Sequence, residues 1–152
     1  TAQILSIKKR KKQSNIKENC TKKLKAVKFI CCMKYFKLRE FVCTCCGKSK
    51  INRTFVKVLD AARAYSKNED GSDIPFIITS GYRCENHPES KKNPNSSHIK
   101  GLAADILVKN SRERAVILAA LMNAGFSRFG IGHNFIHVDL DEDKTQGVIW
   151  TY

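Results

Sequence analysis

The chain has 152 residues, of which 42% are hydrophobic and 28% charged, so it is long enough for one domain with a buried core. No apolar run approaches the roughly 20 residues that span a membrane, and no stretch has the apolar core and cleavage site of a signal peptide. The formal net charge of +14 is concentrated at one end, because residues 1–32 hold ten Lys or Arg against one acid, Glu18.

The basic segment, residues 1–32, lacks a clean hydrophobic period, and we predict a poorly ordered tail with at most a short helix around residues 22–29. Such a tail can bind nucleic acid or an anionic envelope polymer through its lysines. Nucleic-acid binding is not expected outside the tail, and it ranks last among the functions considered, because no aromatic or Gly-rich reading surface accompanies the lysines. Residues 33–152, with eighteen basic against thirteen acidic residues, are predicted to form the folded domain.

The folded domain is predicted to contain two principal helices. Apolar residues recur at steps of three and four in residues 52–66, with Lys and Arg between them. Residues 111–124 form the second helix, in which Ser111 is the expected N-cap and Gly125 follows the last turn.

Apolar and β-branched runs predict the strands at residues 74–80, 103–108, 127–131, 135–140 and 148–152. The segment 33–43 is predicted to be a short strand or an extended stretch, and 84–97 to be a long polar loop. Because short hairpins are expected between the last strands, these elements predict an α+β domain with a mainly antiparallel sheet.

One carboxylate, Asp105, stands in an otherwise apolar run and needs a compensating charge if it is buried. A metal ion is one such charge. His98 precedes Asp105 by seven positions, and strand alternation places His137 and Asp139 on one face of the strand 135–140. Alone, His137 and Asp139 would also fit the solvated face of an edge strand, but Asp105 would stay unexplained. Catalytic zinc takes three protein ligands, and His98, Asp105 and His137 satisfy that count, with Asp139 to orient one of them.

Several segments occur in the order found in one enzyme family: SGYRC at 80–84, SSHIKGLAADI at 96–106, FGIG at 129–132 and FIHVD at 135–139. The chain resembles the zinc D-alanyl-D-alanine carboxypeptidase family over about residues 33–152. It is most similar to the short phage and prophage members, which share its EFxCxCCG opening and VIWTY ending. The resemblance implies the fold that this family shares with the hedgehog signalling domain.

The resemblance also implies an activity, the hydrolysis of peptidoglycan stem peptides by a zinc-dependent D-Ala-D-Ala carboxypeptidase or endolysin-type endopeptidase. It makes His98, Asp105 and His137 the ligands of one catalytic zinc. It makes Arg83 of SGYR a positive group that stabilises the oxyanion or holds a terminal carboxylate. The implied partner is a peptidoglycan peptide, and the implied protein is a monomer that acts on the bacterial cell wall, such as a phage or prophage product released at lysis.

The implied reaction, attack of a zinc-polarised water on a peptide carbonyl, needs a proton acceptor. Many relatives have Glu or Asp three residues before the last ligand, where this chain has Asn134. The first substitute is His133, which is adjacent and titratable, and the second is Asp139. If neither serves, the alternative is a zinc-containing module that binds the cell wall without hydrolysing it.

A cysteine cluster, CTCCG, adds a second question. Three or four thiolates among Cys43, Cys45, Cys46 and Cys84 can bind a structural zinc, although C-x-C-C is not the usual knuckle spacing. They can instead form one disulfide or remain free and buried. An odd total of seven cysteines, some of them adjacent, argues against a simple disulfide framework.

Overall fold

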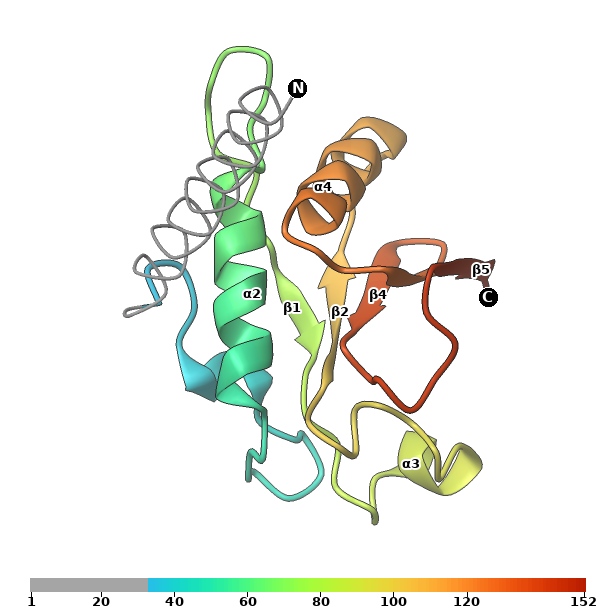
Figure 1. The fold of residues 1–152 in the computed structure, drawn as a ribbon. Coiled ribbons are helices and arrows are strands. Elements are labelled where there is room, and N and C mark those ends of the chain that lie inside the picture. Colours follow the sequence, from blue (N-terminus) through green and yellow to red (C-terminus); the bar gives the residue numbers. More distant parts are fainter. Residues whose placement is uncertain (1–32) are drawn as a thin grey trace, which may run out of the picture. The chain divides into compact units, whose positions relative to one another are not determined.

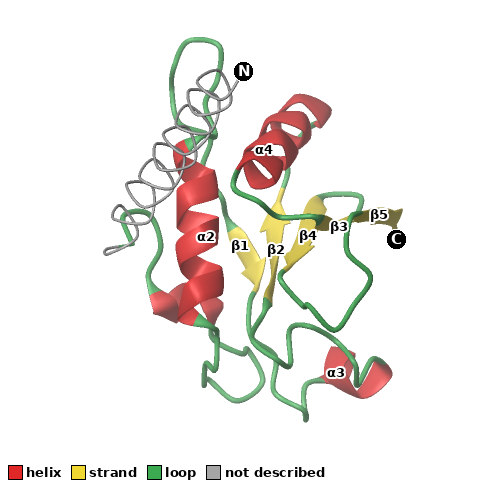
Figure 2. Ribbon diagram, in the orientation of Figure 1, coloured by secondary structure: helices red, strands yellow, loops and turns green. Residues whose placement is uncertain are grey.

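The structure, a computed structural model, describes residues 33–152. The predictions for the basic tail and its short helix lie outside the described residues. In that described part no helix has the length and apolar composition needed to cross a bilayer. The elements, drawn in Figures 1 and 2, are η2 (Leu38–Phe41), α2 (Arg53–Ala64), β1 (Ile78–Ser80), α3 (Pro88–Lys92), β2 (Ala103–Leu107), α4 (Ser111–Asn123), β3 (Arg128–Ile131), β4 (Phe135–Asp139) and β5 (Val148–Thr151).

The strands form one five-stranded sheet in the order β1-β2-β4-β3-β5. All neighbouring pairs are antiparallel except β3 and β5, which run parallel. The predicted α+β domain with a mainly antiparallel sheet is therefore confirmed. A hairpin does join β3 to β4, but the one expected before the last strand is wrong: the connection after β4 passes to the outer edge of β3, and β5 pairs there.

The two faces of the sheet differ in chemistry, because successive side chains of a strand point to opposite sides. One face is apolar and packs against α2 and α4 (Figure 1). Its buried side chains are Ala104, Ile106, Phe129, Ile136 and Val138. The opposite face carries Asp105, His137 and Asp139, which are buried as well. The alternation predicted for the strand 135–140 thus separates the core from a polar site.

Both long helices have an asparagine as N-cap, and the cap of the second lies one residue before the predicted Ser111. Asn52 is the N-cap of α2, and its side-chain oxygen accepts the N–H groups of Thr54 and Phe55 at 2.8 and 3.2 Å. Asn110, rather than Ser111, caps α4 in the same way. The prediction for Gly125 holds, since it follows the last turn of α4 with φ +100°.

Three predicted boundaries need correction. The strand expected over 74–80 is paired only at Ile78–Ser80. The segment 33–43 contains the 3-10 helix η2, and the chain before it is held by the Asp60 carboxylate, which accepts the N–H groups of residues 34–36. The loop 84–97 contains the short helix α3, because Pro88 fixes the first helical φ and the His87 ring accepts the N–H of Glu89.

Candidate metal centre

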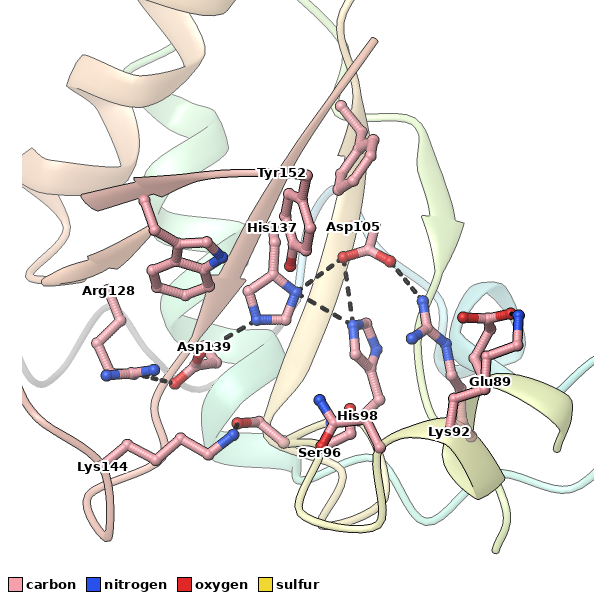
Figure 3. Close-up of a pocket in the computed structure, with 15 residues that line it drawn as sticks. Glu89, Lys92, Ser96, His98, Asp105, Arg128, His137, Asp139, Lys144 and Tyr152 are labelled. Carbon is pink, nitrogen blue, oxygen red and sulfur yellow. Dashed lines mark hydrogen bonds and ion pairs between the residues drawn. The ribbon is translucent and has the colours of Figure 1, made fainter. Parts of the chain in front are cut away.

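The three predicted metal ligands come together at the polar face of the sheet. Asp105 of β2 and His137 of β4 are direct partners in the antiparallel ladder. His98 lies in the turn before β2, which Gly101 allows with φ +70°; a Cβ there would stand 2.2 Å from the Lys50 carbonyl oxygen. Figure 3 shows the side chains of His98, Asp105 and His137 pointing toward one another.

Three atoms of this cluster converge on one point. The Asp105 Oδ1 lies 2.9 Å from His137 Nδ1 and 3.2 Å from His98 Nε2, and the two ring nitrogens are 3.2 Å apart. All three residues are buried. The spacing brings one atom from each residue within reach of a single small cation.

The other ring nitrogen of each histidine fixes its tautomer. His98 Nδ1 lies 2.6 Å from the Gly81 carbonyl oxygen, and His137 Nε2 lies 3.1 Å from Asp139 Oδ2. Carbonyl and carboxylate oxygens only accept, so these nitrogens carry the hydrogens and donate. With both rings neutral, the converging nitrogens present lone pairs toward each other and toward a carboxylate oxygen, an arrangement that a cation between them would stabilise. The donor set fits a divalent metal such as zinc.

Burial and mutual contacts set the charges of the cluster. Burial raises the pKa of Asp105, but the contacts with His137 and His98 outweigh it and hold that pKa well below its usual range. Burial lowers the pKa of His98 and outweighs the contact with Asp105, which raises it. The carboxylate is thus ionised, and His98 favours the neutral form that a metal ligand needs.

Asp139 acts as a brace for His137. Its Oδ1 accepts from Arg128 Nε at 2.8 Å and from the Asp141 N–H at 3.1 Å, while Oδ2 accepts from His137. The Arg128 guanidinium also lies 5.3 Å from the centre of the Trp150 ring. Every oxygen of this carboxylate is thus engaged, which favours the orienting role predicted for Asp139 over the role of proton acceptor.

Arg83 braces Asp105 from the other side. Its Nη2 donates to Asp105 Oδ2 at 2.6 Å and its Nε donates to Ser80 Oγ at 2.8 Å. Asp105 therefore gives one oxygen to the guanidinium and keeps Oδ1 for the converging nitrogens. The Arg83 side chain is 19% exposed and lines the cleft above the cluster.

The cluster forms the floor of a cleft of about 490 Å³. Sequence analysis did not predict that the following residues line it: Glu89, Lys92, Asn93, Ser96, Ser97, Arg128, Phe135, Lys144, Trp150 and Tyr152. For two of these a signal existed. Alternation in VIWTY puts Trp150 and Tyr152 on one face, and the ladder then sets Trp150 opposite Gly130, whose other neighbour is His137. Because Gly130 has no side chain, the Trp150 ring lies 5.6 Å from the His137 ring.

His133 is placed elsewhere. It lies in the exposed turn between β3 and β4, beside Asn134, and is not among the residues that line the cleft. Its backbone carbonyl accepts from Arg114 on α4. This position does not favour the role of proton acceptor that the sequence suggested.

An α+β domain in which two histidines and one carboxylate converge on the floor of a polar cleft is typical of mononuclear metal-dependent hydrolases. A family model described as Peptidase M15 matches residues 34–139. The chain therefore belongs to the Peptidase M15 family, a zinc-dependent metallopeptidase family of the D-Ala-D-Ala carboxypeptidase type, as the resemblance predicted. No curated protein matches the chain significantly.

Proposed function

We propose that the protein is a zinc-dependent peptidase that hydrolyses the stem peptides of peptidoglycan. The observation that carries this proposal is the convergence of lone pairs from His98, Asp105 and His137 in the cleft of an M15 chain. A zinc ion bound there would supply a Lewis acid that polarises water and the scissile carbonyl.

The walls of the cleft suit a short peptide with anionic groups. Four cationic side chains line it: Arg83, Lys92, Arg128 and Lys144. The cleft also has an aromatic wall of Phe135, Trp150 and Tyr152, with the Phe135 and Tyr152 rings 5.2 Å apart. Cations suit peptide carboxylates, and the aromatic wall suits small apolar side chains such as alanine methyl groups.

Arg83 is the group best suited to the developing charge on the substrate. Nε and Nη2 are held by Ser80 and Asp105, so the guanidinium has a fixed orientation in the cleft. No partner is found for Nη1 among residues 33–152, which leaves it to hold a carbonyl oxyanion or a terminal carboxylate.

Glu89 is the carboxylate best suited to accept a proton from the nucleophilic water. Three acids line the cleft, but Asp105 belongs to the metal centre and Asp139 is engaged by Arg128 and His137. Among residues 33–152, the Glu89 carboxylate is paired with Lys92 alone, 2.6 Å away. The contact with Lys92 lowers the pKa of Glu89, so the carboxylate is ionised at neutral pH and able to act as a base.

A second cavity of about 390 Å³ adjoins the cleft and favours an endopeptidase over a carboxypeptidase. Arg83 and Glu89 line both cavities, and the second follows β1, an edge strand of the sheet. A groove that continues on both sides of the cleavage point accommodates a chain that extends in both directions. We further propose a monomeric phage or prophage product that acts on the bacterial cell wall.

The test is mass spectrometry of purified peptidoglycan fragments after incubation with the zinc-loaded protein. New amino and carboxyl ends within the stem peptide are expected, and release of single D-alanine would favour the carboxypeptidase instead. His98→Ala should abolish cleavage, with Lys109→Ala, an exposed residue outside the cleft, as the control. Tight retention on cell walls with no fragment from the wild-type protein would favour the non-hydrolytic binding module.

A further inference from the structure

Four cysteines gather where the turn at residues 43–47 meets the residue that follows Arg83. The Sγ atoms of Cys43, Cys46 and Cys84 lie within 4.8 Å of one another. Burial raises the pKa of Cys84, and the neighbouring thiols of Cys43 and Cys45 raise it further. All four cysteines are free thiols. Such a cluster disfavours several thiolates at once unless a cation compensates them.

The structure changes how the motif CTCCG is interpreted. Cys43 and Cys46, two of the three cysteines whose sulfur atoms lie closest together, have the spacing C-x2-C. That spacing is common among structural zinc sites, so the unusual overall spacing C-x-C-C does not by itself argue against one. The turn is closed by the N–H of Gly47, which donates to the Cys43 carbonyl at 2.8 Å, and by the Cys43 N–H, which donates to the Lys48 carbonyl at 2.8 Å.

Backbone donors surround the buried sulfur of Cys43. The N–H of Cys84 lies 3.3 Å from Cys43 Sγ and donates to it. Burial raises the pKa of Cys43, but the N–H groups of Cys84, Cys46 and Cys45 outweigh burial and bring that pKa down to about 7. The backbone N–H of Cys84 thus points at a sulfur that also lies within 4.8 Å of two other sulfur atoms, a geometry that suits a metal-bound thiolate.

We propose that Cys43, Cys46 and Cys84 bind a structural zinc ion, with Cys45 as the fourth ligand. Sulfur ligands select a soft or borderline metal, and four protein ligands leave no position for water. Each thiol gives its proton to solvent as its bond to zinc forms. This site is separate from the catalytic cleft and does not depend on the proposed hydrolytic activity.

The cluster fixes the segment that carries Arg83. Cys84 follows Arg83 directly, and the Arg83 N–H donates to the His98 carbonyl at 3.2 Å. One residue earlier, the Tyr82 N–H donates to the Phe41 carbonyl at 3.0 Å, just before the cysteine turn. A metal bridge between Cys43 and Cys84 would tie together two segments 41 residues apart and hold Arg83 in place over the metal centre.

The test is the zinc content of the full chain, purified under reducing conditions and measured by elemental mass spectrometry. About two zinc ions per chain are expected, and Cys84→Ser and His98→Ala should each leave about one. Cys46→His should keep both ions, because imidazole replaces a thiolate in many such sites, while Cys46→Ser should lose one. Cys20→Ser, outside the described residues, is the matched control.

A second measurement keeps the test valid if Cys84→Ser folds poorly. In the wild-type protein, the four thiols should resist alkylation until a chelator is added, as counted by mass spectrometry of peptides. The proposal would be overturned if the wild-type protein contained only one zinc ion per chain and Cys84→Ser contained the same amount. A mass lower by two hydrogens, with Cys84 in a disulfide, would overturn it as well. Loss of the thiolate zinc in His98→Ala would contradict the independence of the two sites.

Discussion

Replacing Asp139 by asparagine tests how the metal centre is braced. The carboxylate is 1% exposed and accepts from three groups: His137, Arg128 and the backbone N–H of Asp141. Asparagine has the same shape but only one acceptor oxygen, so its NH2 group must face a donor. The change therefore alters hydrogen bonding without opening a cavity.

Each orientation of the new amide has its own cost. If the NH2 group faces His137, the ring must move its hydrogen to Nδ1, which removes the lone pair aimed at the metal. Loss of such a brace lowers metal affinity by about 10–100-fold, or roughly 1.4–2.7 kcal/mol. In either orientation the neutral amide also removes the buried ion pair with Arg128, at a cost of about 3 kcal/mol, the low end of the usual range because Arg128 keeps its bond to the Thr145 carbonyl. If the NH2 group faces Arg128, the hydrogen bond between the two side chains is lost as well.

Two assays separate these outcomes. Zinc affinity is measured by competition with a chromophoric chelator, and the free energy of unfolding by urea denaturation of the zinc-free protein. The control is Asp143→Asn, since the Asp143 side chain is 84% exposed and, within the part of the chain that the structure describes, pairs only with Lys100. Zinc affinity and stability both equal to those of the control would refute the bracing role of Asp139.

Three further predictions concern the cleft and its support. Glu89→Gln should lower the rate of hydrolysis about 100-fold with unchanged zinc content, whereas Glu142→Gln, an exposed acid outside the cleft, should not; equal rates would exclude Glu89 as the base. Gly130→Ala would place a Cβ 2.8 Å from the ring of Trp150, so the fluorescence of this single tryptophan should change and hydrolysis should fall; an unchanged spectrum would contradict the packing. Burial raises the pKa of Asp141, but its bonds to Lys100 and Ser97 lower it more, so the folded pKa lies below the unfolded one. The contribution of Asp141 to the free energy of unfolding is therefore complete above the unfolded pKa of about 3.9 and is lost as the pH falls through the folded pKa. Urea denaturation at several acidic pH values should show a smaller loss of stability in Asp141→Asn, and identical profiles would count against this role.

The cluster of candidate metal ligands was the easiest part of the site to predict from the sequence. Asp105 stands out because a charged residue lies in an otherwise apolar run. Burying a charge without a compensating partner is costly, so the sequence alone indicates that Asp105 needs such a partner. His137 follows from the alternation of its strand. The structure brings both together with His98, although the metal itself was inferred from the donor set.

The rest of the cleft depends on contacts that no local pattern encodes. Trp150 reaches the centre because β5 pairs in parallel with β3, and Arg128 reaches Asp139 across the β3–β4 ladder. Glu89 lies in the cleft because α3 forms within a stretch whose prolines and asparagines resemble a loop. The pairing of Cys43 with Cys46 likewise depends on the turn conformation, which composition does not reveal.

The carboxylate of Asp105 is shared between two cations, since one oxygen accepts from Arg83 and the other faces the metal position. Thermodynamic linkage makes the two contacts reciprocal. An anion that draws Arg83 away from Asp105 leaves more negative charge on Asp105 for a bound metal. Conversely, metal binding weakens the contact between Asp105 and Arg83 by the same factor. Small carboxylates that bind in the cleft should therefore change the zinc affinity of this protein. Through the shared side chain of Asp105, zinc affinity would depend on which ligand occupies the cleft.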